Sequence, residues 1–352
     1  MSRRPRLSPA VGKARNLLRE VLTTAGAAAD GPPPGEGAPL LLVACSGGPD
    51  SLALASVAAY FGRTGAWRVG AVVVDHQLQA GSAAVARAAV EALTAMGLDP
   101  VEVSTVTVSS AGSGPEAAAR AARYGALEDA ARRLGATSVL LGHTLDDQAE
   151  QVLLGLARGS GTRSLAGIPA RRGLFLRPFL GLRRAETLAI CHAEGLAPWH
   201  DPANADPAFL RSRVRTEVMP YLEDALGPGI AESLHRSAVI LGQDADYLDS
   251  LAAAEYARIA EDVSGEVRLD EDLLRALPPA LRQRVLGLAV VGLGGSRPSF
   301  ERLQAAEALL RRRGSAGPIQ LAGKVSAYRQ PRGAPRGGRG AYGKLVLRRS
   351  GS

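Results

Sequence analysis

The segment Ser46-Gly47-Gly48-Pro49-Asp50-Ser51 brings glycines, hydroxyls and a carboxylate together between an apolar run and a helical pattern. Two glycines let the backbone approach an anion closely, and successive amide N–H groups at the start of a helix attract phosphate. Asp50 would repel that phosphate unless a cation bridged the two. The segment therefore predicts a phosphate site, with a tight turn of purely geometric role as the alternative. It lacks the lysine of GxxxxGK[ST] and the spacing of GxGxxG.

A second group of polar residues, Gly142-His143-Thr144-Leu145-Asp146-Asp147, follows another apolar run. Adjacent carboxylates at the start of a helix repel each other, and Mg²⁺, which prefers oxygen ligands, would relieve that repulsion. Asp146 could instead cap the helix, and His143 could be a core histidine. We favour a functional role for Asp147 and a phosphate or substrate contact for His143, because both follow a strand.

The elements that must position these residues alternate between strands and helices. Apolar runs predict strands and intervening patterns predict helices; the strands are 40–45, 68–76, 101–108 and 137–141, and the helices are 50–61, 82–96, 116–134 and 146–157. Near-continuous apolar strands alternating with helices predict an α/β fold with a doubly wound parallel sheet. Because ligands bind at the carboxyl ends of such strands, the two polar groups should meet at one edge.

The rest of the chain predicts further parts. Residues 1–39 form a basic N-terminal arm with a short helix near 11–24 and a linker at 31–37, and residues 40–222 form the α/β domain, with a last strand at 174–179 and a helix at 184–194. From 223 to 317 we predict a second, mainly helical domain without strands. Residues 318–352 form a basic hairpin whose strands, 319–328 and 344–347, flank the loop 331–340.

Composition narrows the class of protein. The net charge is +8, yet residues 311–352 hold eleven Lys or Arg and no acid, which suits a polyanion partner or a solvated tail. The two cysteines, Cys45 and Cys191, form no CxxC pair, which argues against a disulfide framework or a metal cluster. The basic start lacks an apolar leader, and no apolar run could span a bilayer. We therefore expect a cytoplasmic enzyme with no membrane association.

These motifs carry a family resemblance. SGGxDS after a first strand resembles the PP-loop of ATP pyrophosphatases, and the stretch from His143 to Gly161, HTLDDQAEQVLLGLARGSG, resembles the lysidine synthetase family in particular. Val74-Asp75-His76, the helix with Glu116, Arg120, Arg123 and Tyr124, and the stretch from Asp201 to Arg215 also match. The resemblance covers about 40–222. Ala203 and Ser212 depart from it, where the family often has Ser and Asn, and Pro49 has no N–H to offer phosphate.

The resemblance implies an ATP-dependent activity on RNA. ATP would be held by Ser46, Gly47, Gly48, Pro49, Asp50 and Ser51, and Mg²⁺ by Asp50 and Asp147. Cytidine 34 in the CAU anticodon of tRNA(Ile) would be adenylated, and free L-lysine would then displace AMP to give lysidine. The resemblance makes Asp50, Arg123, His143 and Asp147 catalytic. It also makes 223–317 a tRNA-binding domain.

Several points stay open at this level. Arg211 and Arg215 are four residues apart and could face a phosphate of RNA or ATP, or form a surface charge run. The chain could be a monomer or a homodimer. Rival activities are a tRNA thiolase, a small-molecule ligase of the NAD or GMP synthetase type, and a catalytically silent RNA-binding protein. Few cysteines, the basic end and the intact acidic motif disfavour them in that order.

Overall fold

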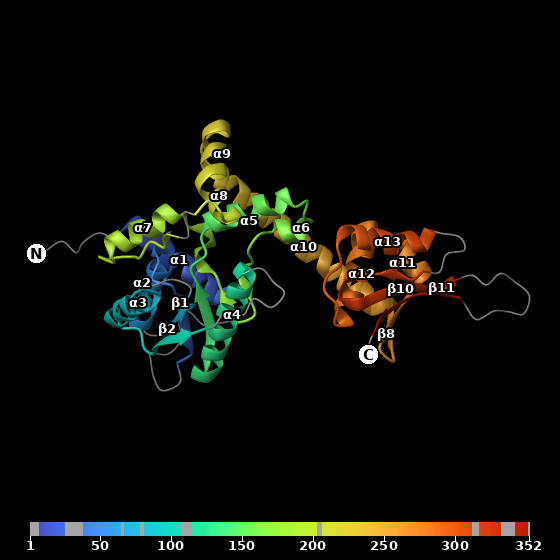
Figure 1. The fold of residues 1–352 in the computed structure, drawn as a ribbon, viewed down its shortest axis with the longest axis horizontal. Helices are drawn as coiled ribbons and strands as arrows, with labels where there is room; N and C mark the ends of the chain where they lie inside the picture. The colour runs from blue at the N-terminus through green and yellow to red at the C-terminus, as the bar shows by residue number, and fades with distance from the viewer. Residues whose placement is uncertain are drawn as a thin grey trace, which may run out of the picture. The chain divides into compact units, whose positions relative to one another are not determined.

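The computed structural model describes residues 7–24, 38–64, 67–77, 81–106, 115–202, 206–311, 317–331 and 342–350. These residues form two compact units, which meet in sequence between Leu241 and Gly242 (Figure 1). The division of the chain into four parts stays a prediction. In the described parts no helix combines the length and apolar character needed to cross a membrane.

The first unit is built on a six-stranded sheet in the order β3-β2-β1-β4-β6-β5. All neighbours are parallel except β5, which runs antiparallel to β6 at one edge. The strands are β1 (Leu40–Cys45), β2 (Arg68–Asp75), β3 (Val101–Thr105), β4 (Ala136–Leu141), β5 (Arg171–Arg172) and β6 (Phe175–Leu176). The predicted doubly wound parallel sheet is confirmed, although the last strand is shorter than expected because Pro178 begins a 3₁₀ turn, η1 (Pro178–Gly181).

Helices cover both faces of this sheet, as Figure 1 shows. One face packs on the helices α1 (Pro9–Thr24), α2 (Pro49–Thr64), α3 (Ser82–Ala95) and α7 (Arg184–Ala193). The other face packs on α4 (Pro115–Leu134), whose Leu127 is fully buried. Sequence analysis did not anticipate that α1 joins the main core through Val11, Ala14, Leu18 and Leu22, all at most 2% exposed.

The remaining helices of the first unit follow β4 and β6. They are α5 (Leu145–Ala157), α6 (Thr162–Leu165), α8 (Leu210–Arg213), a π-helical turn (Val214–Val218), α9 (Met219–Leu226) and the start of α10 (Ile230–Ile259). α5 and the turn at Val214 share a small apolar cluster with Met219 and Ala231. This cluster brings the arginines of 211–215 over α5.

The second unit contains a five-stranded antiparallel sheet in the order β7-β8-β11-β10-β9, with helices packed on it. Its elements are β7 (Ala260–Val263), β8 (Glu266–Asp270), α11 (Glu271–Ala276), α12 (Pro279–Gly292), α13 (Phe300–Arg311), β9 (Ile319–Gln320), η4 (Ala322–Lys324), β10 (Val325–Pro331) and β11 (Tyr342–Arg349). The predicted pairing of the two terminal strands is confirmed. The basic loop 331–340 lies outside the described residues, apart from the backbone of Pro331.

The expectation that 223–313 holds no strand is wrong, because β7 and β8 form a hairpin there. Ser264 and Gly265 join the strands with φ of 50° and 80°, the left-handed backbone that two-residue hairpin turns require. Each strand is only four or five residues long and mostly polar. Val267 and Leu269 are the buried pair of β8, and two apolar residues are too few to separate a strand from a helix by periodicity.

Candidate active site at the carboxyl edge of the parallel sheet

The loop after β1 is shaped by Gly47 and by the start of α2. Gly47 has φ of 79°, which favours glycine, and Pro49 begins the helix where its missing N–H costs nothing. The amides of the first helical turn, including those of Asp50 and Ser51, have no partner inside the helix. The Ser51 hydroxyl lies 3.2 Å from the Ser46 amide nitrogen and 3.0 Å from the Gly48 carbonyl, so it braces the loop.

Gly142 brings the second polar group to this loop. A Cβ atom built at Gly142 would lie 3.0 Å from both the carbonyl carbon and oxygen of Asp50. A larger residue would push the end of β4 away from the start of α2. The close approach places His143 and Asp147 beside the loop, as predicted from the parallel sheet.

Asp147 is held by the start of its own helix. Thr144 is the N-cap of α5, and Asp147 accepts hydrogen bonds from the Thr144 N–H (2.8 Å) and hydroxyl (3.0 Å). Asp146 does not cap α5. It accepts a hydrogen bond from the Arg184 amide at the start of α7 (2.7 Å) and pairs with Arg183 (3.1 Å). Asp146 thus ties α5 to α7, and Asp147 faces the loop.

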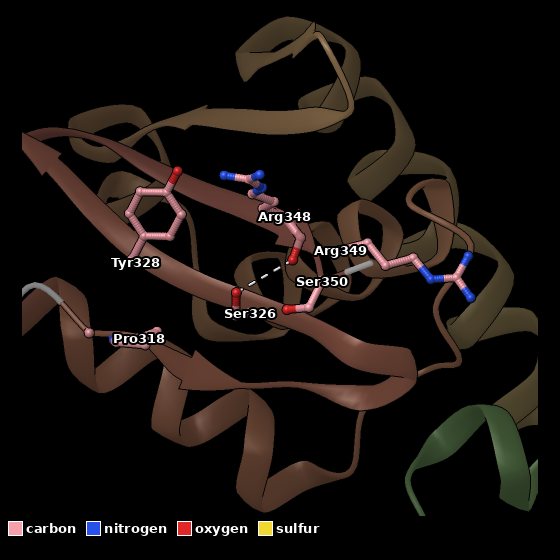
Figure 2. A pocket seen from close by; sticks show the side chains of 7 residues that line it. Pro318, Ser326, Tyr328, Arg348, Arg349 and Ser350 are labelled. Atoms are coloured by element: carbon pink, nitrogen blue, oxygen red, sulfur yellow. Dashed lines mark hydrogen bonds between the residues drawn. The ribbon is translucent and has the colours of Figure 1, made fainter. Parts of the chain in front are cut away.

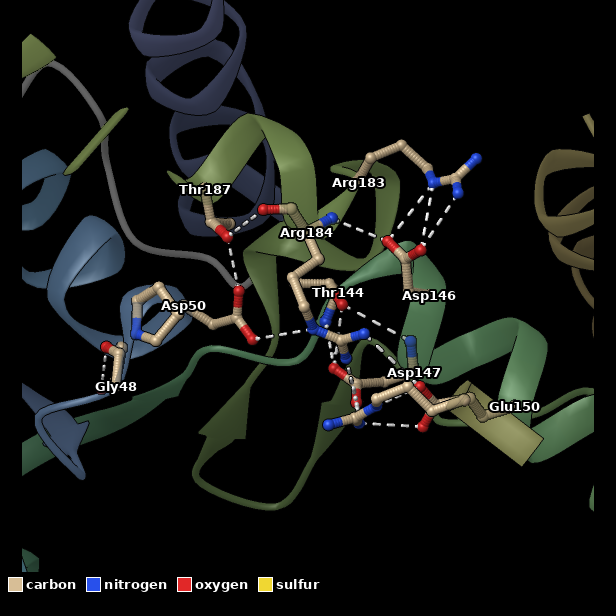
Figure 3. A network of polar contacts seen from close by, with 12 residues as sticks. Gly48, Asp50, Thr144, Asp146, Asp147, Glu150, Arg183, Arg184 and Thr187 are labelled. Atoms are coloured by element: carbon tan, nitrogen blue, oxygen red, sulfur yellow. Dashed lines mark hydrogen bonds and ion pairs between the residues drawn. The ribbon is translucent and has the colours of Figure 1, made fainter. Parts of the chain in front are cut away.

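One guanidinium, that of Arg184, connects the acidic groups (Figure 3). Its nitrogens lie 3.7 Å from Asp50 Oδ2, 3.3 Å from Asp147 Oδ1 and 3.5 Å from Glu150 Oε1. The buried Thr187, one turn further along α7, holds the other oxygen of Asp50 at 2.5 Å from its hydroxyl. α7 therefore fixes the position of the carboxylate that the phosphate loop presents.

The two arginines predicted to contact RNA or ATP lie against Glu150. Arg215 donates to Glu150 Oε1 (2.7 Å) and reaches Asp147 Oδ1 (3.3 Å), and Arg211 donates to Glu150 Oε2 (3.2 Å). Glu150 is 1% exposed. The pairing neutralises a buried carboxylate, and it leaves Arg211 Nη2 buried without a partner among the described residues.

The two predicted metal-binding carboxylates have different electrostatic surroundings. Burial raises the pKa of Asp50, and the Thr187 hydrogen bond and the Arg184 charge offset only part of this effect. Burial also acts to raise the pKa of Asp147, but Arg184 and the Thr144 N–H outweigh it, so the pKa of Asp147 is lowered. Asp147 is thus the more firmly ionised of the two.

His143 is a neutral imidazole at physiological pH. Burial, reinforced by the charges of Arg177, Arg123 and Arg120, lowers the pKa of His143 to about 3 although Asp147 opposes the shift. Its Nδ1 atom is buried with no partner among the described residues, and so is Nε of Arg123. A neutral imidazole and an unpaired guanidinium at this edge could both hydrogen-bond an incoming phosphate or base.

The structure brings most predicted site residues together. Loop residues 46–51, His143, Asp147 and the pair Arg211 and Arg215 all lie at the carboxyl edge, with Arg123 reaching it from α4. Sequence analysis missed Arg184 and Thr187, which carry no motif and resemble ordinary helix residues. It also assigned no role to Glu150, although Glu150 lies one turn after Asp147 and faces the same way. Asn204 and Ala203 lie outside the described residues.

The second unit has a hollow of its own, shown in Figure 2, with a volume of about 590 Å³. Tyr328 hydrogen-bonds Glu266 (3.1 Å) at its wall, and Arg348 is exposed. The hollow is lined by Gly317, Pro318, Ser326, Tyr328, Arg348, Arg349 and Ser350. It carries no carboxylate pair or phosphate loop, and the chemistry therefore belongs to the first unit.

Comparison with known proteins agrees with this arrangement. Residues 19–222 match the family model described as a PP-loop domain, and residues 269–331 match a TilS substrate binding domain. The tRNA(Ile)-lysidine synthase of Leifsonia xyli subsp. xyli is 52% identical over 294 residues, covering 83% of this chain and 87% of that protein. The chain belongs to the tRNA(Ile)-lysidine synthase family. The synthase of Salinispora arenicola is 46% identical over 331 residues, covering 92% of this chain and 95% of that protein.

A solved structure supports the fold independently of the family. The U34-tRNA thiolase NcsA from Methanococcus maripaludis, solved with its [4Fe-4S] cluster, superposes with a TM-score of 0.53 at 17% identity. The match covers 66% of this chain and 80% of that one. Iron–sulfur clusters are held by thiolates, commonly four, whereas this family member has two cysteines. Both are buried, and burial raises the pKa of Cys191 to about 11.

Proposed function

We propose that this chain uses ATP to adenylate O2 of cytidine 34 in the CAU anticodon of tRNA(Ile), and then joins free L-lysine to C2. AMP and pyrophosphate leave, and lysidine remains. Membership of the synthase family supports this proposal, and so does one observation in the site. Asp50 from the phosphate loop and Asp147 from the start of α5 converge on a single guanidinium. The reaction takes place in the cytoplasm.

ATP would lie with its pyrophosphate part on residues 46–51. The free amides at the start of α2 and the helix dipole suit that charge. Half-buried Arg123 and neutral His143 would face the α-phosphate, where the cytidine oxygen attacks. Arg123 would offset the charge that builds up on the phosphorus oxygens, and His143 would donate a hydrogen bond without adding charge.

The residues present fit a magnesium ion. Asp50 and Asp147 already share one cation, Arg184, which indicates that their charges need compensation. Mg²⁺ would be held by these two carboxylates with phosphate and water oxygens, as is usual for this ion. No group of three or more acidic, histidine or cysteine ligands gathers in the described residues, so the nucleotide must complete the site. When bound, the ion would neutralise phosphate charge, and Arg184 would turn towards Glu150.

Free lysine would enter a small pocket on the far side of this network. The pocket has a volume of about 180 Å³ and is lined by Asp146, Glu150, Arg183, Arg184, Arg215, Met219, Pro220 and Glu223. Its carboxylates match two ammonium groups, its arginines match one carboxylate, and Met219 and Pro220 offer apolar surface to a methylene chain. Such a mixed lining suits an amino acid with a charged side chain.

The second unit would hold the body of the tRNA. Its basic terminal strands and the hollow of Figure 2 present Arg348 and Arg349 beside Tyr328, a combination suited to phosphates and an exposed base. Its match to a substrate binding domain supports the same role.

The test is incorporation of labelled lysine into purified CAU-anticodon tRNA(Ile), with ATP, Mg²⁺ or tRNA omitted in turn. We expect label that depends on all three components. Asp50→Asn and Asp147→Asn should each abolish it while the exposed control Asp129→Asn on α4 keeps it. ATP cleavage without lysine incorporation into this tRNA, but with another acceptor, would refute the assignment.

A further inference from the structure

Four arginines surround the ring of Tyr124 on α4. Arg177 donates a hydrogen bond to the Tyr124 hydroxyl (3.1 Å). The guanidinium carbons of Arg120, Arg123 and Arg172 lie 5.2, 5.8 and 6.0 Å from the centre of the ring. The ring itself is fixed by edge-on packing against Phe175, with centroids 4.8 Å apart. Residues from α4, β5 and the end of β6 thus build one cluster.

No acidic side chain in the described residues pairs with any of these arginines. Arg177 is 2% exposed, and its bonds go only to the Pro169 carbonyl (2.8 Å) and the Tyr124 hydroxyl. Its Nε atom and that of Arg123 are buried with no partner. A buried guanidinium without a counter-charge is unfavourable. Burial and the neighbouring arginines also lower the pKa of Arg123 although Tyr124 opposes this shift, so the cluster lacks an anion.

The hydroxyl of Tyr124 adds a donor to this cluster. It accepts from Arg177 and lies 3.5 Å from Arg120, which leaves its own proton free for an acceptor. No acceptor for that proton occurs among the described residues. Five convergent donor groups without an acceptor match the oxygens of a phosphate, and arginine forks suit this geometry.

The position of the cluster indicates which phosphate it takes. Arg177 follows β6, next to β4 and His143, whereas the ATP loop follows β1 on the other side of β4. β1 and β6 are two strand spacings apart, roughly 10 Å. The cluster opens to solvent through the exposed Arg120 and Arg172, and a polymer can enter there.

We propose that Tyr124 with Arg120, Arg123, Arg172 and Arg177 binds a backbone phosphate of the RNA beside the reacting nucleotide. This proposal rests on the proposed function, because it takes the RNA as the substrate of the adjoining site. The contact holds the flipped nucleotide in register with His143. Phosphate contacts of this kind position RNA without reading its sequence.

The test compares two double variants that each remove two positive charges. Arg120→Gln with Arg172→Gln alters the exposed members of the cluster, and Arg132→Gln with Arg133→Gln alters the far end of α4, where the arginines pair with Asp129 and Glu102. Dissociation constants for a CAU tRNA(Ile) transcript are measured across a series of KCl concentrations. Dissociation constants for ATP are measured separately by calorimetry.

We expect the cluster variant to bind tRNA about tenfold more weakly, with a salt slope smaller by about 1, since each lost phosphate contact releases fewer counterions. Its ATP affinity should match that of the unaltered protein, and the control variant should change neither value by more than about twofold. An unchanged salt slope, or equal changes in both variants, would overturn the proposal. Weaker ATP binding with an unchanged tRNA slope would assign the phosphate to ATP instead, which also overturns it.

A third variant tests the centre of the cluster. Tyr124→Phe keeps the ring packing and removes the donor, so we expect several-fold weaker tRNA binding with an unchanged melting temperature. Equal tRNA binding by Tyr124→Phe would remove the hydroxyl from the site. Lysine incorporation by the unaltered protein separates the two ideas. If it fails while the cluster variant still changes the tRNA salt slope, the proposed function falls and the phosphate site stands.

Discussion

His143 offers a quantitative test of the electrostatics of the site. Burial first, and then the charges of Arg177, Arg123 and Arg120, lower its pKa to about 3 against the opposing charge of Asp147. An imidazole in an unfolded chain has a pKa of about 6.5. Between these two values the unfolded chain binds a proton that the folded chain does not. The stability associated with a neutral His143 is therefore fully present above pH 6.5 and is lost as the pH falls towards 3.

The size of this effect follows from proton linkage. Lowering the pH from 7 to 5 should remove about 2 kcal/mol of stability through this one group. His143→Gln has no such proton, so the unfolding free energy of the unaltered protein minus that of the variant should fall by this amount. Other titrating groups, among them His76 with its lowered pKa and Asp50 with its raised one, are present in both proteins and cancel.

Urea unfolding followed by tryptophan fluorescence measures this difference at pH 7, 6 and 5. The chain has two tryptophans, Trp67 and Trp199, and both lie in the first unit. The signal therefore reports the unit that contains His143. His192→Gln, which changes an exposed histidine of α7, serves as the control and should behave like the unaltered protein. A free-energy difference that stays constant from pH 7 to 5 would refute the account of a buried, neutral His143.

Three other predictions follow from the structure and the sequence. Thr187→Val removes the hydroxyl that holds Asp50, a hydrogen bond of about 1 kcal/mol, so the Mg²⁺ concentration for half-maximal activity should rise several-fold, and an unchanged Mg²⁺ dependence would count against that role. Glu150→Gln leaves Arg184, Arg211 and Arg215 without their shared carboxylate; because these arginines are about a quarter exposed, we expect a loss near the lower end of the range for buried pairs, about 3 kcal/mol, measured by denaturant unfolding, and a loss below about 1 kcal/mol would contradict it. Deletion of 331–340 should weaken tRNA binding and flatten its salt dependence, and an equal slope in the shortened chain would exclude this loop as an RNA contact.

Much of the fold could be predicted because its signals are local. The apolar runs of β1, β2 and β4 are typical of strands buried on both faces, and the glycine turn after Cys45 marks the loop between β1 and α2. The hairpin of β7 and β8 could not be predicted in the same way. Its strands bury one face only, and the pairing of β8 with β11 involves residues about eighty positions apart.

The sequence by itself determined which chemical groups the protein has and which edge of the sheet carries them. Asp50, His143 and Asp147 follow strands, and the carboxyl ends of parallel strands meet. Only the tertiary structure decided what each group faces. Arg184 and Thr187 reach Asp50 because α7 packs on α2, and Arg177 reaches Tyr124 because β6 lies beside β4. Such contacts depend on the approach of distant segments, which a local pattern of residue types does not encode.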